Sequence, residues 1–166
     1  MKSETQLSIE NMAHKYRRHF ETSVTPIWHE DISALIEALE AFRAQGLGSP
    51  KSLGERDRKK ARKLARLIKI TDANPAALEL FAAKNLRQLR KIVREAYGSG
   101  SLDVFIEELE AIWNNETQFE SPVNFKTRDG RSISALISMP LPEDPEDHSS
   151  VPVMIMDISE QTRANA

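Results

Sequence analysis

Cysteine is absent from all 166 residues of the sequence. This absence excludes disulfide bonds, zinc sites built on cysteine thiolates and catalysis by a cysteine nucleophile. A chain without cysteine suits a reducing compartment. We therefore expect a cytoplasmic location.

Long apolar runs and a strong charge of one sign are also absent. The net charge is -2, which gives no general preference for nucleic acid or for an anionic membrane. No apolar run approaches the ~20 residues of a membrane-spanning helix. The first ten residues are polar and include two glutamates, unlike a signal peptide. We expect a soluble, intracellular chain, with any membrane segment outside it.

Several motifs of catalytic and metal sites are missing. The chain has no glycine-rich phosphate loop, no Ser-His-Asp order and no His/Asp/Glu cluster with metal-ligand spacing. Glu107 and Glu108 are interpreted as a solvated helix face rather than a pair of catalytic carboxylates. The prediction is a protein that is not an enzyme, with no catalytic residue and no metal ligand.

The N-terminal segment, residues 1–23, has the pattern of an amphipathic flanking helix. Its apolar residues are spaced to form a single stripe over residues 5–22. A lone helix must cover such a stripe, either with its own domain or with a second copy of itself. The stripe is therefore a candidate dimer surface, made by Ile9, Met12, Tyr16 and Phe20.

The middle of the chain alternates short strands and helices. A strand over residues 24–31 places Ile27 and His29 on one face and Trp28 on the other. Asp31 is positioned to cap a helix that ends at the glycines and proline of residues 46–50. A second strand, residues 68–72, precedes Asn74 and Pro75, a cap and first-turn pair that starts a short helix.

Between these strands lies a basic run, residues 51–69. It could contact phosphates, but it has no interleaved aromatic residues for stacking on bases. We interpret it as a solvated helix face, which could also pair with Glu37 and Glu40 of the preceding helix. No nucleic-acid partner is expected.

The last third of the sequence changes from a helical period to alternation. Ser99 or Ser101 is positioned to cap a helix over residues 102–113, and strands follow at about 119–127, 133–139 and 151–158. Asp129 and Gly130 predict a two-residue hairpin turn of type I′, in which both residues need positive φ. The fold class is α+β, with helices on one face of an antiparallel sheet.

Four segments together resemble the PAS domain, a sensory box of bacterial signalling proteins. They are YRRHFETSVTPIW, LIKITDANPAALELF, FKTRDGRSISALISM and VPVMIMDISEQTRA, beginning at residues 16, 67, 125 and 151. The resemblance implies a PAS fold with a five-stranded antiparallel sheet over residues 24–158. A helical insert at 32–66 separates the first two strands, where PAS domains usually have a tight turn. Residues 159–166 would begin an exit helix, so Ala166 is not expected to be a natural end.

The resemblance also implies two sites. A ligand pocket would lie between the long helix and the sheet, although an ordinary filled core is the alternative. A signal junction would join the last strand to the exit helix at Asp157, Ile158 and Ser159, with Ser159 as the helix cap. The pocket would be lined by Phe105, Leu109, Ile112, Ile133, Ile137, Val153 and Ile155.

Known cofactors of this family can be compared with the residues present. Haem needs an axial ligand, usually histidine. None of the four histidines, at positions 14, 19, 29 and 148, lies in the helical region expected to supply it, so haem is not expected. A cysteinyl-flavin adduct and a thioester-linked chromophore are excluded by the lack of cysteine. Non-covalent flavin has no positive support, and the cofactor stays unknown.

The function implied is sensory and regulatory. A ligand or partner would shift the packing of sheet and helices, and a homodimer would relay the shift to an output domain in the same longer chain, such as a histidine kinase of a two-component system or a diguanylate cyclase. The alternatives are a ligand-free module for dimerisation or protein interaction and, third, a nucleic-acid-binding domain.

Overall fold

The computed structural model describes residues 1–165, apart from the side chains of residues 53–55 and 99. The last residue of the predicted exit segment, Ala166, lies outside the described residues. Five antiparallel strands form a sheet in the order β2-β1-β5-β4-β3. Their bounds are β1 Ile27–Asp31, β2 Lys69–Ala73, β3 Gln118–Lys126, β4 Ser132–Pro140 and β5 Val151–Asp157. The predicted five-stranded antiparallel sheet is confirmed.

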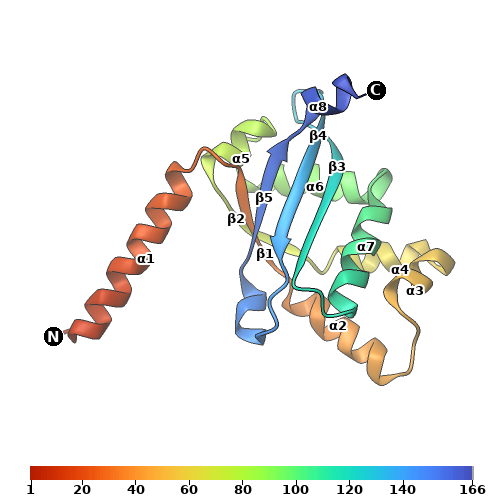
Figure 1. The fold of residues 1–166 in the computed structure, drawn as a ribbon, viewed down its shortest axis with the longest axis horizontal. Helices are drawn as coiled ribbons and strands as arrows, with labels where there is room; N and C mark the ends of the chain where they lie inside the picture. Colours follow the sequence, from red (N-terminus) through yellow and green to blue (C-terminus); the bar gives the residue numbers. More distant parts are fainter. Residues whose placement is uncertain (166) are drawn as a thin grey trace.

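Helices cover one face of this sheet, and the first helix extends away from it (Figure 1). Three helices lie between β1 and β2, in the predicted insert. Helix α6 lies behind the sheet and contacts β2 and β3, α7 packs beside β3, and α8 follows β5. The bounds are α1 Glu4–Thr22, α2 Ser33–Ala44, α3 Pro50–Arg56, α4 Arg58–Ala65, α5 Pro75–Leu80, α6 Leu86–Ser99, α7 Leu102–Trp113, the 3-10 helix η1 Pro145–Ser149, and α8 Ser159–Ala164.

The core lies between the sheet and its helices. Strands β3 and β4 alternate buried and more exposed residues, because only one face of each strand packs on helices. Strand β5 pairs with both β1 and β4, so it lies at the centre of the sheet.

Asn74 fixes the start of α5 against the sheet. Its side-chain oxygen accepts hydrogen bonds from the backbone N–H of Ala77, at 2.9 Å, and of Ile27, at 3.0 Å. Its amide nitrogen donates to the carbonyl of Thr25 at 2.9 Å. The predicted Asn–Pro helix start therefore also joins the end of β2 to the entry of β1.

The hairpin between β3 and β4 differs from the prediction. Gly130 has φ of 88°, but Asp129 is not among the described residues with positive φ, so the turn is not type I′. The backbone N–H of Gly130 donates to the carbonyl of Thr127 at 3.1 Å, and that of Thr127 donates to the carbonyl of Arg131 at 2.8 Å. The strands are thus joined by a longer turn, in which only the glycine takes the left-handed conformation.

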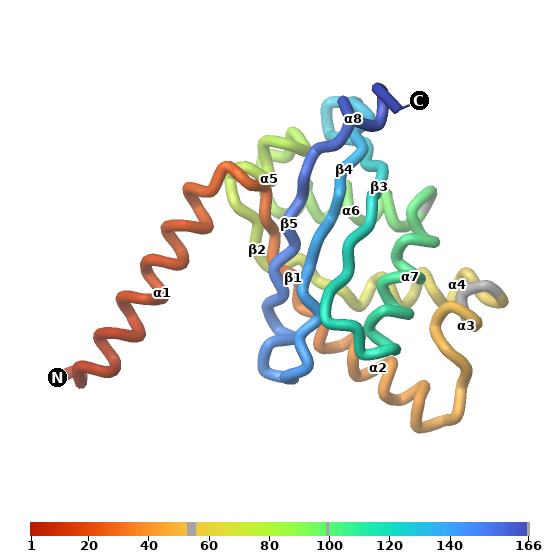
Figure 2. The backbone as a smooth tube through the Cα atoms, viewed as in Figure 1, coloured from red at the N-terminus to blue at the C-terminus, as the bar shows by residue number. Residues whose placement is uncertain are grey.

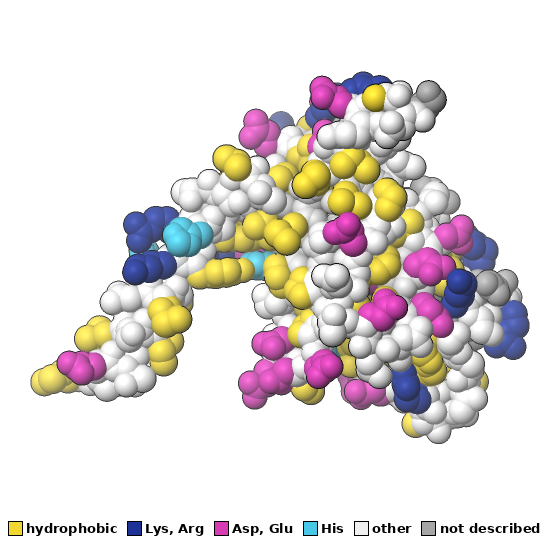
Figure 3. Space-filling view, in the orientation of Figure 1, with side chains coloured by type: hydrophobic (Ala, Val, Ile, Leu, Met, Phe, Trp, Pro, Cys, Tyr) yellow, Lys and Arg dark blue, Asp and Glu magenta, His cyan; other side chains and the backbone are white. Residues whose placement is uncertain are grey.

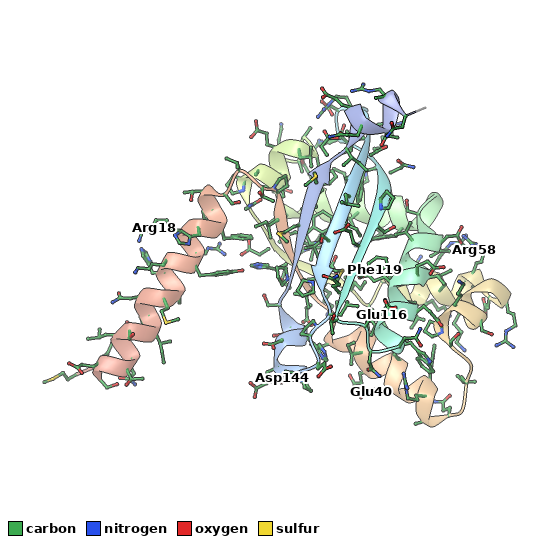
Figure 4. The ribbon with its side chains drawn as sticks, viewed as in Figure 1. Arg18, Glu40, Arg58, Glu116, Phe119 and Asp144 are labelled. Carbon is green, nitrogen blue, oxygen red and sulfur yellow. The ribbon has the colours of Figure 1, made fainter. Side chains whose placement is uncertain are left out.

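The insert packs on α7 (Figure 2). Lys51 pairs with Glu107 at 3.3 Å, and Arg58 pairs with Asp103 at 2.8 Å. Figure 4 shows Arg58 beside α7. Among the described residues, these two members of the basic run therefore pair with acids of α7 and not with Glu37 or Glu40, because α3 and α4 fold back over the later helix.

Candidate functional site

The residues predicted to line a pocket lie in the space between α7 and the sheet. Six of them are at most 5% exposed and belong to one packed core. The seventh, Ile112, is half-buried and borders a separate surface cavity with Trp113. Trp113 is half-buried, and the guanidinium of Arg43 lies over its ring at 4.2 Å. Trp28 is fully buried.

The same interior contains two buried glutamates. Glu108, on α7, is 2% exposed, and Glu30, on β1, is 3% exposed. The interpretation of Glu108 as part of a solvated face is wrong; only Glu107 is exposed. Glu108 is three residues after Phe105 and four before Ile112, so its position within the apolar stripe was the signal that sequence reasoning missed.

Glu30 is only partly satisfied by its neighbours. Its Oε1 accepts a hydrogen bond from Trp28 Nε1 at 2.9 Å. Its Oε2 is buried and has no hydrogen-bond partner among the described residues. Burial therefore raises the pKa of Glu30 to about 7. A carboxyl group in this position favours its protonated form.

The charges of the buried groups act on one another. Burial, followed by the charge of Glu30, raises the pKa of Glu108. Burial also raises the pKa of Tyr97 on α6, with further contributions from Glu108 and then Glu30. Tyr97 packs against Phe105 of α7, with ring centroids 5.8 Å apart. Strand β1 and helices α6 and α7 thus place two acids and a phenol near one another in the core.

Helix α1 contacts the other face of β1 through its last turns. Phe20 is buried and stacks on His29, with ring centroids 4.6 Å apart, and the Tyr16 hydroxyl lies 2.8 Å from His29 Nε2. Arg17 forms an ion pair with Asp72 of β2. Burial lowers the pKa of His29, so its neutral form is favoured in this contact.

The predicted dimer stripe is therefore divided between two environments. Phe20 packs within its own chain, whereas Ile9 and Met12 are 60% and 68% exposed. The outer face of the sheet also exposes apolar side chains, with Met154 and Met156 of β5 at 47% and 60%. Figure 3 shows apolar side chains on α1 and on this face of the sheet.

The predicted signal junction is tied to β4. Asp157 accepts hydrogen bonds from the backbone N–H and the hydroxyl of Ser159, at 2.9 and 2.6 Å. The backbone N–H of Ser134 donates to the Ser159 hydroxyl at 3.0 Å, and that of Ile158 donates to the Ser134 carbonyl at 2.8 Å. The hydrogen bonds to Ser159 hold the pKa of Asp157 below its usual value.

Three predicted caps differ from the structure. Ser159 is the first residue of α8, whose cap position is Ile158, so Asp157 rather than Ser159 accepts the first free N–H. Ser101 is at the cap position of α7 without a side-chain hydrogen bond, and the side chain of the alternative, Ser99, lies outside the described residues. Asp31 accepts from the backbone N–H of Ser33 at 2.9 Å, although the cap position of α2 is Ile32.

The histidines occupy three separate elements. His14 and His19 lie on α1, His29 on β1, and His148 in η1, where its Nε2 is 2.8 Å from the carbonyl of Pro142. Across the described part of the chain, no three His, Cys, Asp or Glu side chains come together as metal ligands. Within the same residues, no helix has the length and apolar character needed to cross a membrane.

Comparisons with known proteins identify the fold. No protein-family model matches the sequence, and no curated protein is significantly similar to it. A PAS domain from Colwellia psychrerythraea is 12% identical, with a TM-score of 0.57 over 90% of this chain and 98% of that one. A domain of a sensory box sensor histidine kinase/response regulator from Geobacter sulfurreducens is 14% identical, with a TM-score of 0.52 over 90% of this chain and 96% of that one. This chain has the PAS fold, as the sequence predicted.

Proposed function

We propose that this PAS-fold chain is a non-catalytic sensory module that acts as a homodimer. The observation that carries the proposal is the pair of uncovered apolar surfaces on α1 and on the outer face of the sheet. Tyr16 and Phe20 contact His29 of β1, so the apolar stripe of α1 faces the sheet. The exposed part of this stripe and the outer face of the sheet therefore form the two sides of one concave surface (Figures 1 and 3). Exposed apolar patches of this kind mark association sites.

A second copy of the chain is the partner that fits the concave surface between α1 and the sheet. In a two-fold dimer, each copy contributes the same surface to its partner. Helix α1 of the partner, laid against the sheet, would cover Met154 and Met156 with its own Ile9 and Met12. The first turns of α1 have little tertiary support in a single chain, whereas helices in proteins are stabilised mostly by packing of their apolar face.

The output would lie at the C-terminal end of β5, where α8 begins. Strand β5 carries the exposed methionines and leads directly to Asp157 and α8. A change in dimer packing or in the core would reach α8 through the hydrogen bonds among Asp157, Ser159 and Ser134. A following output domain, such as a histidine kinase or a cyclase in a longer cytoplasmic protein, would receive that change.

A ligand-free interaction module is the second candidate. The tight burial of six of the seven predicted pocket residues favours it, since a filled core leaves little room for a ligand between α7 and β5. In that case the dimer itself, or docking to a partner protein, would be the function.

The test is the oligomeric state of two charge variants and a matched control. We expect a dimer by sedimentation equilibrium, converted largely to monomer by Met12→Glu and by Met156→Glu, because each buries a charge in the proposed interface. Lys15→Glu changes a residue of α1 outside the stripe and should leave the dimer in place. A monomeric parent chain at high concentration would refute the homodimer.

A further inference from the structure

A groove lies between α4, β2 and α6, on the helical side of the molecule. Its volume is about 720 Å³, within the range of small-molecule sites. Among the described lining residues, five are cationic and none is acidic. We call it the arginine groove; it is lined by Arg62, Ala65, Arg66, Ile68, Lys69, Ile70, Arg90, Val93, Arg94, Tyr97 and Gly98.

The arginines face each other as two pairs with helical spacing. Arg62 and Arg66 are four residues apart at the end of α4, and Arg90 and Arg94 are four residues apart on α6. Helices α4 and α6 contact each other, so the four guanidinium groups share one groove. Like charges at this spacing repel, and a second pair across the groove increases the repulsion. A bound anion would offset it.

Two other basic residues of the insert have acidic partners on α7, but these four arginines have none among the described residues. Arg58 and Lys51 pair with acids of α7. Among the described residues, none of the four arginines forms an ion pair with an acidic side chain, and Arg90 Nε donates only to the backbone carbonyl of Ile70, at 2.8 Å. Lys69 lies opposite Asp31 in the sheet, and the charges of the two side chains interact.

The floor of the groove is apolar. Ile70 and Val93 are buried, and Tyr97 closes its inner end with its ring against Phe105. The arginines are exposed above this floor. Guanidinium groups bind carboxylates and phosphates through paired hydrogen bonds, whereas an apolar floor takes an alkyl or similar chain. A ligand with both parts matches the groove better than a phosphate alone.

We propose that the arginine groove binds a small anionic amphiphile, a carboxylate or phosphate head joined to an apolar chain. The insert of residues 32–66 would then have a role, since it supplies Arg62 and Arg66. The apolar chain would contact Tyr97 and, through it, Phe105 of α7 and the core. Binding itself is independent of the proposed homodimer; only the use of the groove for sensing rests on the proposed function.

The test is calorimetric titration of the full chain with decanoate and with decyl phosphate, which differ only in the head group. Both should bind, and the tighter one identifies the head group preferred. Arg62→Gln with Arg66→Gln should weaken binding at least about tenfold, since loss of one charge-assisted contact is sufficient. The matched control, Lys59→Gln with Lys63→Gln, removes the same charge from α4 outside the lining and should change affinity less than about twofold.

A second variant, Arg94→Gln, tests the opposite wall if the double variant unfolds on heating earlier than the parent. Neutral decanol and cationic decyltrimethylammonium should bind at least about tenfold more weakly than decanoate. Decanol or decyltrimethylammonium binding as tightly as decanoate would overturn the proposal. So would a loss of affinity in the Lys59/Lys63 control equal to that in the Arg62/Arg66 variant. So would tight binding of a single-stranded oligonucleotide that the Arg62/Arg66 variant abolishes, with no binding of either amphiphile.

The outcome is separable from the test of the dimer. A dimeric chain that binds neither amphiphile would refute the arginine groove and leave the proposed homodimer standing. A monomeric chain that binds decanoate through Arg62 and Arg66 would support the arginine groove and refute the proposed homodimer.

Discussion

Globular proteins usually bury apolar side chains and expose polar ones. The two faces of the sheet depart from this distribution in opposite ways. The inner face is covered by helices and packed with apolar side chains, yet it encloses Glu30 and Glu108. The outer face is open, yet it exposes Met154 and Met156. Buried charges and exposed apolar patches both cost stability, and such departures concentrate at functional positions. The comparison places a carboxyl group with a raised pKa inside the domain and an uncovered apolar surface outside it.

The largest expected difference between the faces is in packing. Leu109→Ala on α7 should lower the free energy of unfolding by about 2–5 kcal/mol, because it leaves a cavity in the core. Met154→Ala on the outer face should change the stability of the monomer by about 0.5 kcal/mol or less. Urea unfolding at low protein concentration measures both. Equal losses at the two positions would show that the outer face is packed in the monomer as well.

The pH dependence of stability should come from the inner face. Glu30 has a folded-state pKa of about 7, above the ordinary 4.5, so the native state binds more protons between these pH values. Stability should therefore fall as pH rises through this window, by about 3 kcal/mol for Glu30. The raised pKa of Glu108 acts in the same direction. The lowered pKa of His29 acts the opposite way below its ordinary value of 6.5, and the lowered pKa of Asp157 does so only in more acidic solution.

Glu30→Gln should reduce that fall and leave the part due to Glu108, because the amide oxygen keeps the bond from Trp28 without a titrating proton. The matched control, Glu107→Gln on the exposed side of α7, should leave the slope unchanged. Thermal unfolding of the three proteins from pH 5 to 8 makes the comparison. A parent protein that gains stability across this range would contradict the account of the buried acids.

The smallest effect is expected at the junction. Asp157→Ala removes the acceptor of the Ser159 N–H and hydroxyl, at a cost of about 0.5–2 kcal/mol typical of a lost cap. The loss should be local, and amide hydrogen exchange should quicken in α8 but not in β3. Uniform quickening across the sheet would instead indicate that Asp157 supports the whole fold.

Much of the fold could be predicted because it depends on local patterns. Alternation identified β3 and β4, and Asn74 followed by Pro75 marked the start of α5. The predictions of burial and of ion pairs failed where segments distant in the sequence determine the surroundings of a side chain. Trp28 and the packing of α6 and α7 bury Glu30 and Glu108, and the folding back of the insert gives Arg58 its partner Asp103. The prediction of a type I′ turn at Asp129 failed because Asp followed by Gly also occurs in longer turns, in which only the glycine has positive φ.

Of the candidate sites, the placements of Asp157 and Phe105 followed from the resemblance. The arginine groove did not, because its walls come from positions about thirty residues apart in the sequence that only the fold brings together. The basic run gave a partial signal, since helical spacing placed Arg62 and Arg66 on one face of α4.

The most direct test of the central claim, that a second copy covers the outer face, uses the absence of native cysteine. One copy carries Met12→Cys and another carries Met154→Cys, and the two are mixed under mild oxidation. The account predicts a disulfide-linked heterodimer in high yield, with little product from Lys15→Cys and Met154→Cys as the control pair. Cross-linking only between two Met12→Cys copies, or none at all, would contradict it.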